Sequence, residues 1–329
     1  MTMSERVARL RQQSLDAVPS ISAERAELMT AFYQQNHELQ STPLFRARAF
    51  RYLMENRTIA IGEDELIIGE KGPSPKATPT YPELCCHTLE DLELLDTRPK
   101  IPFTAGPEVC RTYRQTIIPF WEGRSMREII FKQMNANWIH CYDAGLFTEF
   151  MEQRAPGHTV LDDKIYHHGM LEFIARIQTR LDHLDYLHDP DAYAQSEQLK
   201  AMEITAEALI LFAERHAAEA RRQAAQHSDP QRRAELEQIA ALCEHVPAHA
   251  PRNFWEAIQY YWFVHLGVTT ELNTWDSFSP GHLDQHLQPF YEEGLRSGQL
   301  TRAQAEELLG CLWIKFNNQP APPKVGVTA

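Results

Sequence analysis

Pro-Arg-Asn-Phe-Trp-Glu-Ala-Ile-Gln-Tyr-Tyr-Trp-Phe-Val-His-Leu, residues 251–266, is the stretch that decides the fold of this chain. A helix is expected here, with apolar and aromatic side chains on every side of it. A surface helix carries only one apolar stripe, so a helix that is apolar all round lies inside a protein. We therefore expect a helical core that surrounds residues 251–266.

Helical patterns continue from this stretch along most of the chain. The sequence predicts two or three helices within residues 4–57, helix again over about 117–153, and another around 168–185. A long helix over 192–226 has small and apolar residues on one face and charged residues on the other. We expect it to form an antiparallel hairpin with the helix that begins at Pro230.

Two helix starts carry capping signals in the sequence. Ser22 precedes Leu28 and Phe32, which have helical spacing, and is a candidate cap. Thr301 and Gln304 have the spacing of a capping box, in which each residue bonds the backbone of the other. The second signal predicts a helix from about residue 302.

Two regions depart from the helical pattern. Residues 59–61 and 65–70 have the composition of short extended segments, and four prolines predict a loop over 72–82. Residues 319–329 leave a proline-rich turn and enter what resembles a buried strand. Folded domains seldom finish on an apolar strand that has just begun, so we expect the chain to be cut short there.

Composition limits the classes of function. The chain has 329 residues, 43% of them hydrophobic and 23% charged, which suits one large domain or two ordinary ones. The formal net charge of −13 would repel a phosphate backbone, so we expect no nucleic-acid partner. No apolar run is long enough to span a membrane, and residues 1–6 lack an apolar signal core. We expect a cytoplasmic protein.

The cysteines and histidines indicate neither a disulfide framework nor a metal site. The six cysteines have no Cys-x-x-Cys spacing, so we interpret them as reduced thiols. His282 and His286 could face one metal from a single helical turn, but no third ligand is obvious. Pro247 would break the helix that His245 and His249 need in order to share a face. The sequence therefore predicts no metal.

One histidine follows a strong helix stop. Residues 147–159 read Phe-Thr-Glu-Phe-Met-Glu-Gln-Arg-Ala-Pro-Gly-His-Thr, and the Pro-Gly pair ends a helical pattern just before His158. Locally, His158 is either a surface residue after a helix end or a group aimed into a cleft. The local pattern alone favours the first interpretation.

One carboxylate lies among aromatic residues. Asp276 stands between Trp275 and Phe278, shortly after the fully apolar helix. A carboxylate in such surroundings needs a cation or several donors, or it takes up a proton. Asp276 therefore either caps the helix that follows Pro280 or binds a cationic nitrogen of a substrate.

Five of these stretches together resemble the amino-terminal part of the glycyl radical enzymes, the pyruvate formate-lyase-like superfamily. They are residues 18–26, 64–70, 147–159, 252–257 and 281–286. Within the superfamily, residues 150–159 and 273–276 are most similar to the subgroup that dehydrates trans-4-hydroxy-L-proline. The resemblance covers the whole chain.

The resemblance implies an α/β fold that is predominantly α-helical in this segment, the amino-terminal part of a ten-stranded α/β barrel. Residues 1–329 would be part of a single domain, truncated before the loop with the catalytic cysteine and the loop with the radical glycine. It also implies that His158 lies near a departing hydroxyl and that Asp276 pairs with a ring ammonium. An imidazole can protonate a leaving oxygen, and a carboxylate pairs strongly with an ammonium.

The resemblance further implies cofactors and partners. No cofactor would bind directly; a glycyl radical on the missing part would be installed by a radical SAM activase. The intact enzyme of anaerobic metabolism would be a homodimer that acts on a small-molecule substrate, as a dehydratase and thus a lyase.

The chain departs from the family pattern in one respect. No cysteine here has glutamate two places on, and no Arg-Val-x-Gly-Tyr loop occurs, so we expect no catalytic residue and no turnover by this segment alone. Alternatives are another glycyl radical lyase (a diol dehydratase, a carbon–nitrogen or carbon–sulfur lyase, or a formate acetyltransferase-like enzyme) and a non-catalytic helical interaction protein derived from the fold.

Overall fold

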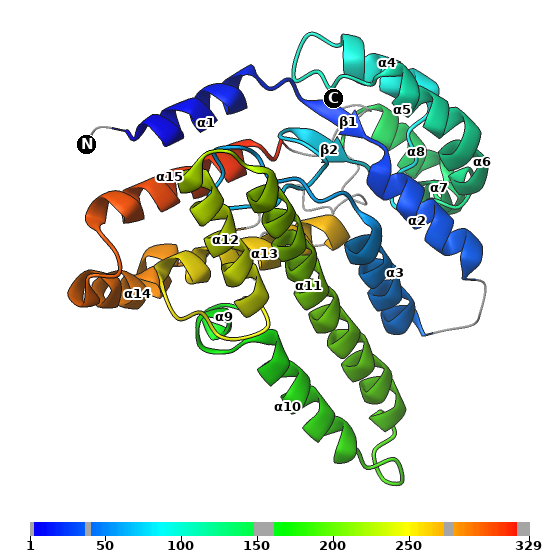
Figure 1. Ribbon diagram of the computed structural model, residues 1–329. Helices are drawn as coiled ribbons and strands as arrows, with labels where there is room; N and C mark the ends of the chain where they lie inside the picture. The colour runs from blue at the N-terminus through cyan, green and yellow to red at the C-terminus, as the bar shows by residue number, and fades with distance from the viewer. Residues whose placement is uncertain (1–2, 37–40, 148–160, 273–278, 321–329) are drawn as a thin grey trace.

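The computed structural model describes residues 3–36, 41–147, 161–272 and 279–320, and these form a mostly helical protein (Figure 1). The helix predicted around 251–266 is α13 (Phe254–Leu272). Tyr260, Trp262 and Phe263 of α13 are fully buried, and the main hydrophobic cluster surrounds them. The prediction of an internal helix is confirmed, because its aromatic residues on every face meet other elements of the fold.

The long helix α11 (Ala192–Gln226) packs against α12 (Pro230–His245), as the sequence predicts. Asp229 caps α12 by accepting hydrogen bonds from two backbone amides of its first turn, and Pro230 occupies the start of the helix, where no amide donor is needed. α11 also packs against α10 (Met170–Asp182), α3 (Thr42–Asn56) and α13. Figure 1 shows α11 running along the molecule between α3 and α10.

Three helices lie in the amino-terminal region: α1 (Glu5–Asp16), α2 (Glu24–Gln35) and α3. The predicted cap of α2 is wrong by one residue, because Ala23 holds the cap position and Ser22 belongs to the strand β1 (Ser20–Ser22). The Ser22 hydroxyl still accepts a hydrogen bond from the backbone amide of Glu24 at 3.4 Å. Ser22, the residue predicted to be the cap, therefore bonds the start of α2 although it belongs to β1.

In the described part of the chain, the sheet has two strands. β1 pairs in parallel with β2 (Ala77–Pro79), with Ile21 opposite Thr78. β2 falls within residues 72–82, which the four prolines predicted to be a loop. Pro79 ends the strand, where a missing amide donor is tolerated.

The extended segments predicted at 59–61 and 65–70 are not strands. Helix side chains take the place of a neighbouring strand: Gln259 of α13 donates to the Ile68 carbonyl at 3.0 Å and accepts from the Ile68 amide at 2.9 Å. Trp255 donates to the Leu66 carbonyl and Trp262 to the Gly69 carbonyl, each at 2.9 Å. The segment is buried and bends at residues 66–67, and its backbone partners are indole and amide groups.

The remaining helices form two groups (Figure 1). One group lies beyond α2 and contains α4 (Leu89–Thr97), α5 (Pro107–Thr112), a π-helical turn (Tyr113–Ile117), α6 (Ile118–Trp121), α7 (Met126–Gln133) and α8 (Ala136–Asp143). The other lies beside α13 and contains α9 (Lys164–His167), α14 (Leu283–Ser297) and α15 (Arg302–Asn317). The predicted capping box of α15, between Thr301 and Gln304, is present.

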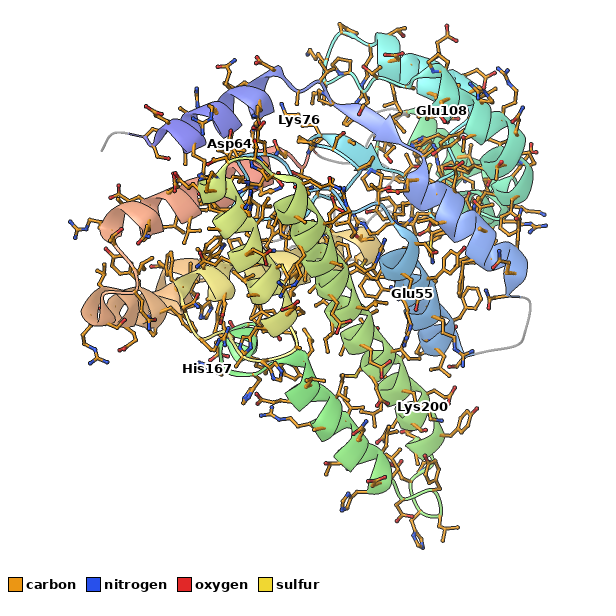
Figure 2. All side chains as sticks on the ribbon, in the orientation of Figure 1. Glu55, Asp64, Lys76, Glu108, His167 and Lys200 are labelled. Carbon is orange, nitrogen blue, oxygen red and sulfur yellow. The ribbon has the colours of Figure 1, made fainter. Side chains whose placement is uncertain are left out.

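Charged side chains spread over distant parts of the surface, for example Glu55 on α3, Glu108 on α5 and Lys200 on α11 (Figure 2). No helix among the described residues is long and apolar enough to cross a membrane. Other charged side chains are buried, and these form the candidate functional site.

Candidate functional site

The two site residues predicted from the sequence lie outside the described residues, His158 in 148–160 and Asp276 in 273–278. Their roles as substrate-binding residues stay predictions. The described chain resumes at Leu161 and stops at Leu272, the last residue of α13. What the structure does show is how the carboxyl end of α13 is held just before the segment that carries Asp276.

Two residues from other elements bond the backbone at this end of α13. Arg25 of α2 donates from Nε to the Thr270 carbonyl at 2.8 Å, and the Tyr81 hydroxyl donates to the Thr269 carbonyl at 2.5 Å. The last carbonyls of a helix have no partner within it, and cations are favourable there. These bonds fix the position from which the chain enters residues 273–278.

A buried ion pair supports Arg25. Its guanidinium binds both carboxylate oxygens of Glu83, at 2.6 and 3.2 Å, and both side chains are 5% exposed. The guanidinium also lies over the Tyr81 ring, with Cζ 3.8 Å from the ring centroid. Burial has the largest single effect and lowers the pKa of Arg25, but Glu83, with Tyr81 and Glu271, outweighs it and holds that pKa above its ordinary value. Arg25 is therefore cationic and fixed in place.

Two further cations lie beside this pair. Arg57 donates to the Thr270 hydroxyl at 2.9 Å and to the carbonyls of Glu70 and Lys71 at 2.6 and 2.8 Å. Lys71 is 8% exposed, and its Nζ lies 5.8 Å from the centroid of the Tyr81 ring. We call this group of buried residues the α13-end cluster: Arg25, Arg57, Lys71, Tyr81, Glu83 and Thr270.

A second buried network holds the segment that carries Lys71. Lys315 of α15 binds the carboxylates of Glu65 and Glu70, the latter at 2.8 Å, and Asn318 donates to Glu70 at 3.2 Å. All three charged side chains are at most 8% exposed. Burial raises the pKa of the Glu70 carboxyl above its ordinary value, although Lys315 opposes this shift. Lys315 therefore ties the buried segment 65–70 to α15.

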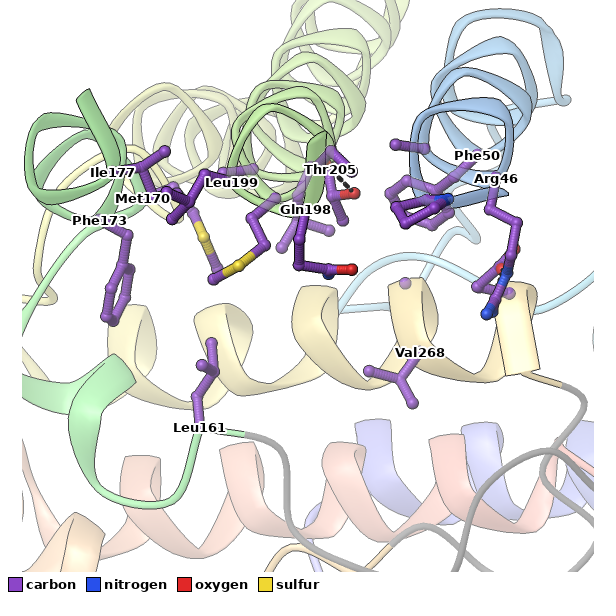
Figure 3. Close-up of a pocket in the computed structure, with 18 of the residues that line it drawn as sticks. Arg46, Phe50, Leu161, Met170, Phe173, Ile177, Gln198, Leu199, Thr205 and Val268 are labelled. Carbon is purple, nitrogen blue, oxygen red and sulfur yellow. Dashed lines mark hydrogen bonds and ion pairs between the residues drawn. The ribbon is translucent and has the colours of Figure 1, made fainter. Parts of the chain in front are cut away.

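A groove of about 760 Å³ lies between α3, α10 and α11, over α13. Figure 3 shows its lining, which includes Phe50, Met170, Phe173 and Leu199. Arg46 at its edge is bound to Glu271 at 2.5 Å. Sites for small polar ligands gather several convergent polar groups, and this mainly apolar groove does not. We therefore place the candidate functional site at the α13-end cluster.

The cysteines and histidines of the described residues do not form a reactive or metal-binding group. No cluster of three or more histidine, cysteine or acidic residues could hold a metal there. All six cysteines are free thiols, as predicted, and burial raises the pKa of Cys86 to about 12. His286 stacks on Tyr166, and His245 stacks on His249.

The model of the pyruvate formate lyase-like family matches residues 1–329. The chain belongs to this family, as the five motifs indicated.

Individual relatives narrow the similarity further. The chain is 51% identical to trans-4-hydroxy-L-proline dehydratase of Clostridioides difficile over 98% of its own length and 41% of that protein. A crystal structure of hydroxyproline dehydratase from the same organism, with trans-4-hydroxy-L-proline bound, superposes with a TM-score of 0.95 at 50% identity. It is matched over 99% of this chain and 41% of that one.

A more distant relative acts on another compound. The chain is 34% identical to isethionate sulfite-lyase of Desulfovibrio desulfuricans, over 94% of this chain and 38% of that protein. The chain therefore spans about two fifths of the length of these relatives. The predominantly helical character predicted for the segment is confirmed, and the segment has the fold of the corresponding part of solved glycyl radical enzymes.

Proposed function

We propose that this chain contributes to a glycyl radical dehydratase that removes water from trans-4-hydroxy-L-proline. The observation that supports this most is the 51% identity to the hydroxyproline dehydratase of C. difficile across 98% of the chain. Identity falls to 34% for a relative named for a different substrate. The α13-end cluster supports a binding role for Asp276, because it holds the chain in place just before that residue.

We propose further that residues 1–329 are the amino-terminal part of one domain. The catalytic cysteine and the radical glycine would lie in the remaining part, since no cysteine here has a glutamate two positions later. The glycyl radical supplies the hydrogen-abstracting chemistry, and a radical SAM activase would install it. The intact enzyme would be a cytoplasmic homodimer. This chain alone would bind substrate groups without turning them over.

His158 and Asp276 would bind opposite ends of the substrate. The Asp276 carboxylate would pair with the ring ammonium, and the His158 imidazole would hydrogen-bond the 4-hydroxyl. When the carbon–oxygen bond breaks, the proton on imidazolium would join the departing hydroxide as water. The roles are complementary, because one group fixes the orientation and the other assists the leaving group.

The proposed activity is tested on the complete enzyme, activated anaerobically by a radical SAM activase. We expect kcat/KM for trans-4-hydroxy-L-proline to exceed that for 1,2-propanediol or isethionate by at least about a hundredfold, because a site that pairs with the ring ammonium rejects compounds without it. Loss of water is followed by mass spectrometry. Faster turnover of the diol or of isethionate would assign the chain to another branch of the family.

The Asp276→Asn variant of the same enzyme tests the binding role. Charge-assisted hydrogen bonds contribute about 1.5–3 kcal/mol, so KM for hydroxyproline should rise roughly ten- to hundredfold while kcat changes little. Asp284→Asn, at an exposed position on α14, is the matched control and should leave KM unchanged. An unaltered KM in Asp276→Asn would remove the ammonium role.

A further inference from the structure

The α13-end cluster contains more buried positive than negative charge. Its cations are Arg25, Arg57 and Lys71, all at most 8% exposed, and its one buried carboxylate is Glu83. Glu24, which is half-buried, adds a second carboxylate at the edge and raises the pKa of Arg57 against the lowering effect of burial. Three cations thus face two carboxylates, which leaves a surplus of one positive charge.

The carboxylates near these three cations already have partners. Glu83 binds Arg25 through both oxygens. Glu24 accepts hydrogen bonds from the amide and the hydroxyl of Thr58, at 2.8 and 2.5 Å. Glu271 also acts on Arg25 at longer range, but it is paired with Arg46 at the edge of the groove. The surplus charge therefore falls on the other two cations, Arg57 and Lys71.

Arg57 bonds only neutral acceptors, namely the Thr270 hydroxyl and two backbone carbonyls. Among the described residues, Lys71 Nζ has no hydrogen-bond or ion-pair partner, and it lies over the face of the Tyr81 ring. Buried charges in proteins are paired, or else they lose their charge. Burial, together with Arg25 and Arg57, lowers the pKa of Lys71 to about 7, which shows how poorly its charge is compensated.

A small cavity lies where these cations meet. Its walls include the cations Arg25, Arg57 and Lys71 and one carboxylate, Glu24, and its volume is about 10 Å³. The other lining residues are Ser22, Leu53, Gly72, Pro79 and Thr270. That volume is about what a single water molecule needs. Sulfate, phosphate and nucleotides are too large for it, so only a very small ligand can lie there.

We propose that this cavity is a binding site for one small monovalent anion of halide size, held between Lys71 and Arg57. The charge of such an ion equals the surplus of the cluster, and halides are among the smallest common anions. The ion would keep Lys71 and Arg57 cationic and so strengthen their hold on the carboxyl end of α13. The inference does not depend on the proposed function, because it concerns only charges and space within the described residues.

The test is the effect of bromide on thermal unfolding, at constant ionic strength with gluconate as the replacing anion. Anion binding to the folded state should raise the Tm of the wild-type chain by about 2 °C for each tenfold increase in bromide above its Kd. Lys71→Met should abolish this dependence. The variant should still fold, since an apolar residue of similar length replaces a cation that has no carboxylate partner. Lys100→Met, at an exposed position, is the control and should respond like the wild type.

Crystals soaked in bromide give a second, direct measurement. An anomalous difference peak within hydrogen-bond reach of Lys71 Nζ, absent in Lys71→Met, would establish the site. A water molecule at that position with no anomalous signal would overturn the proposal and leave Lys71 as a neutral amine. Equal bromide dependence of the Tm in wild type and Lys71→Met would overturn it as well.

Discussion

Lys315→Met should destabilise the chain by about 3–5 kcal/mol near neutral pH, because removing one partner of a buried ion pair leaves uncompensated charge. Lys315 is 3% exposed and binds two carboxylates, those of Glu65 and Glu70, which are 8% and 3% exposed. Equilibrium unfolding in urea measures the change. Lys200→Met is the control, since Lys200 also pairs with a glutamate but its side chain is 49% exposed, and it should cost at most about 1 kcal/mol.

The cost of Lys315→Met should also depend on pH, in a direction set by Glu70. Burial already raises the pKa of Glu70 above its ordinary 4.5, and loss of Lys315, which lowers it, would raise it further. A carboxyl whose folded pKa is raised stabilises the fold below its unfolded pKa, and this stabilisation is lost as pH rises through the folded pKa.

The difference in unfolding free energy between wild type and Lys315→Met should therefore be smaller at about pH 5 than at about pH 8. Urea unfolding at several values across this interval measures it. A difference that stays constant with pH, or that grows as pH falls, would contradict the view that two buried carboxylates depend on Lys315 for their charge compensation.

The sequence predicts this fold best where the pattern within one element settles its structure. The apolar residues on every side of 251–266, the amphipathic pattern of 192–226, and the Thr301–Gln304 capping box are all local, and all three helices are present. Helical periodicity and caps depend on neighbours three or four positions away, so they can be read along the chain.

Prediction fails where the partner is distant in sequence. Residues 65–70 have the composition of a strand, but Gln259 lies 191 positions from the Ile68 backbone that it bonds. The sequence of the segment itself cannot show whether its amides meet another strand or the side chains of a helix. The α13-end cluster could not be predicted for the same reason. In the sequence, Arg25 resembles a surface residue on a charged helix, and only the fold shows that Glu83 and Thr270 lie beside it.

The candidate site was therefore only partly accessible from the sequence. Family resemblance singled out His158 and Asp276, and both stay predictions. Arg25 lies within the first of the five motifs, residues 18–26, but the motif assigned it no role, and no motif contains Arg57 or Lys71. One signal was present in retrospect: Lys71 stands in an apolar stretch that ends in Gly69-Glu70-Lys71-Gly72, where a charged pair is unexpected.

Arg25→Met should cost about 3–5 kcal/mol of unfolding free energy, because it leaves the buried Glu83 carboxylate without its arginine and the Thr270 carbonyl without its donor. Arg9 provides a matched control. Like Arg25, it binds both oxygens of one carboxylate, here Asp64 at 2.9 and 2.7 Å, but its side chain is 54% exposed. Arg9→Met should therefore cost at most about 1 kcal/mol. Urea unfolding of both variants isolates the effect of burial.

A double variant separates the ion pair from the helix anchor. Arg25→Met with Glu83→Met removes both charges, so it should be more stable than Arg25→Met alone by about 1–3 kcal/mol, since no buried carboxylate is left behind. It should not return to wild-type stability, because the Thr270 carbonyl at the end of α13 still lacks its donor. If the double variant were as unstable as Arg25→Met, the cost would come from the lost helix anchor alone. Full recovery would mean that Arg25 matters only as the counter-charge of Glu83, and that α13 needs no support at the point where it leads into Asp276.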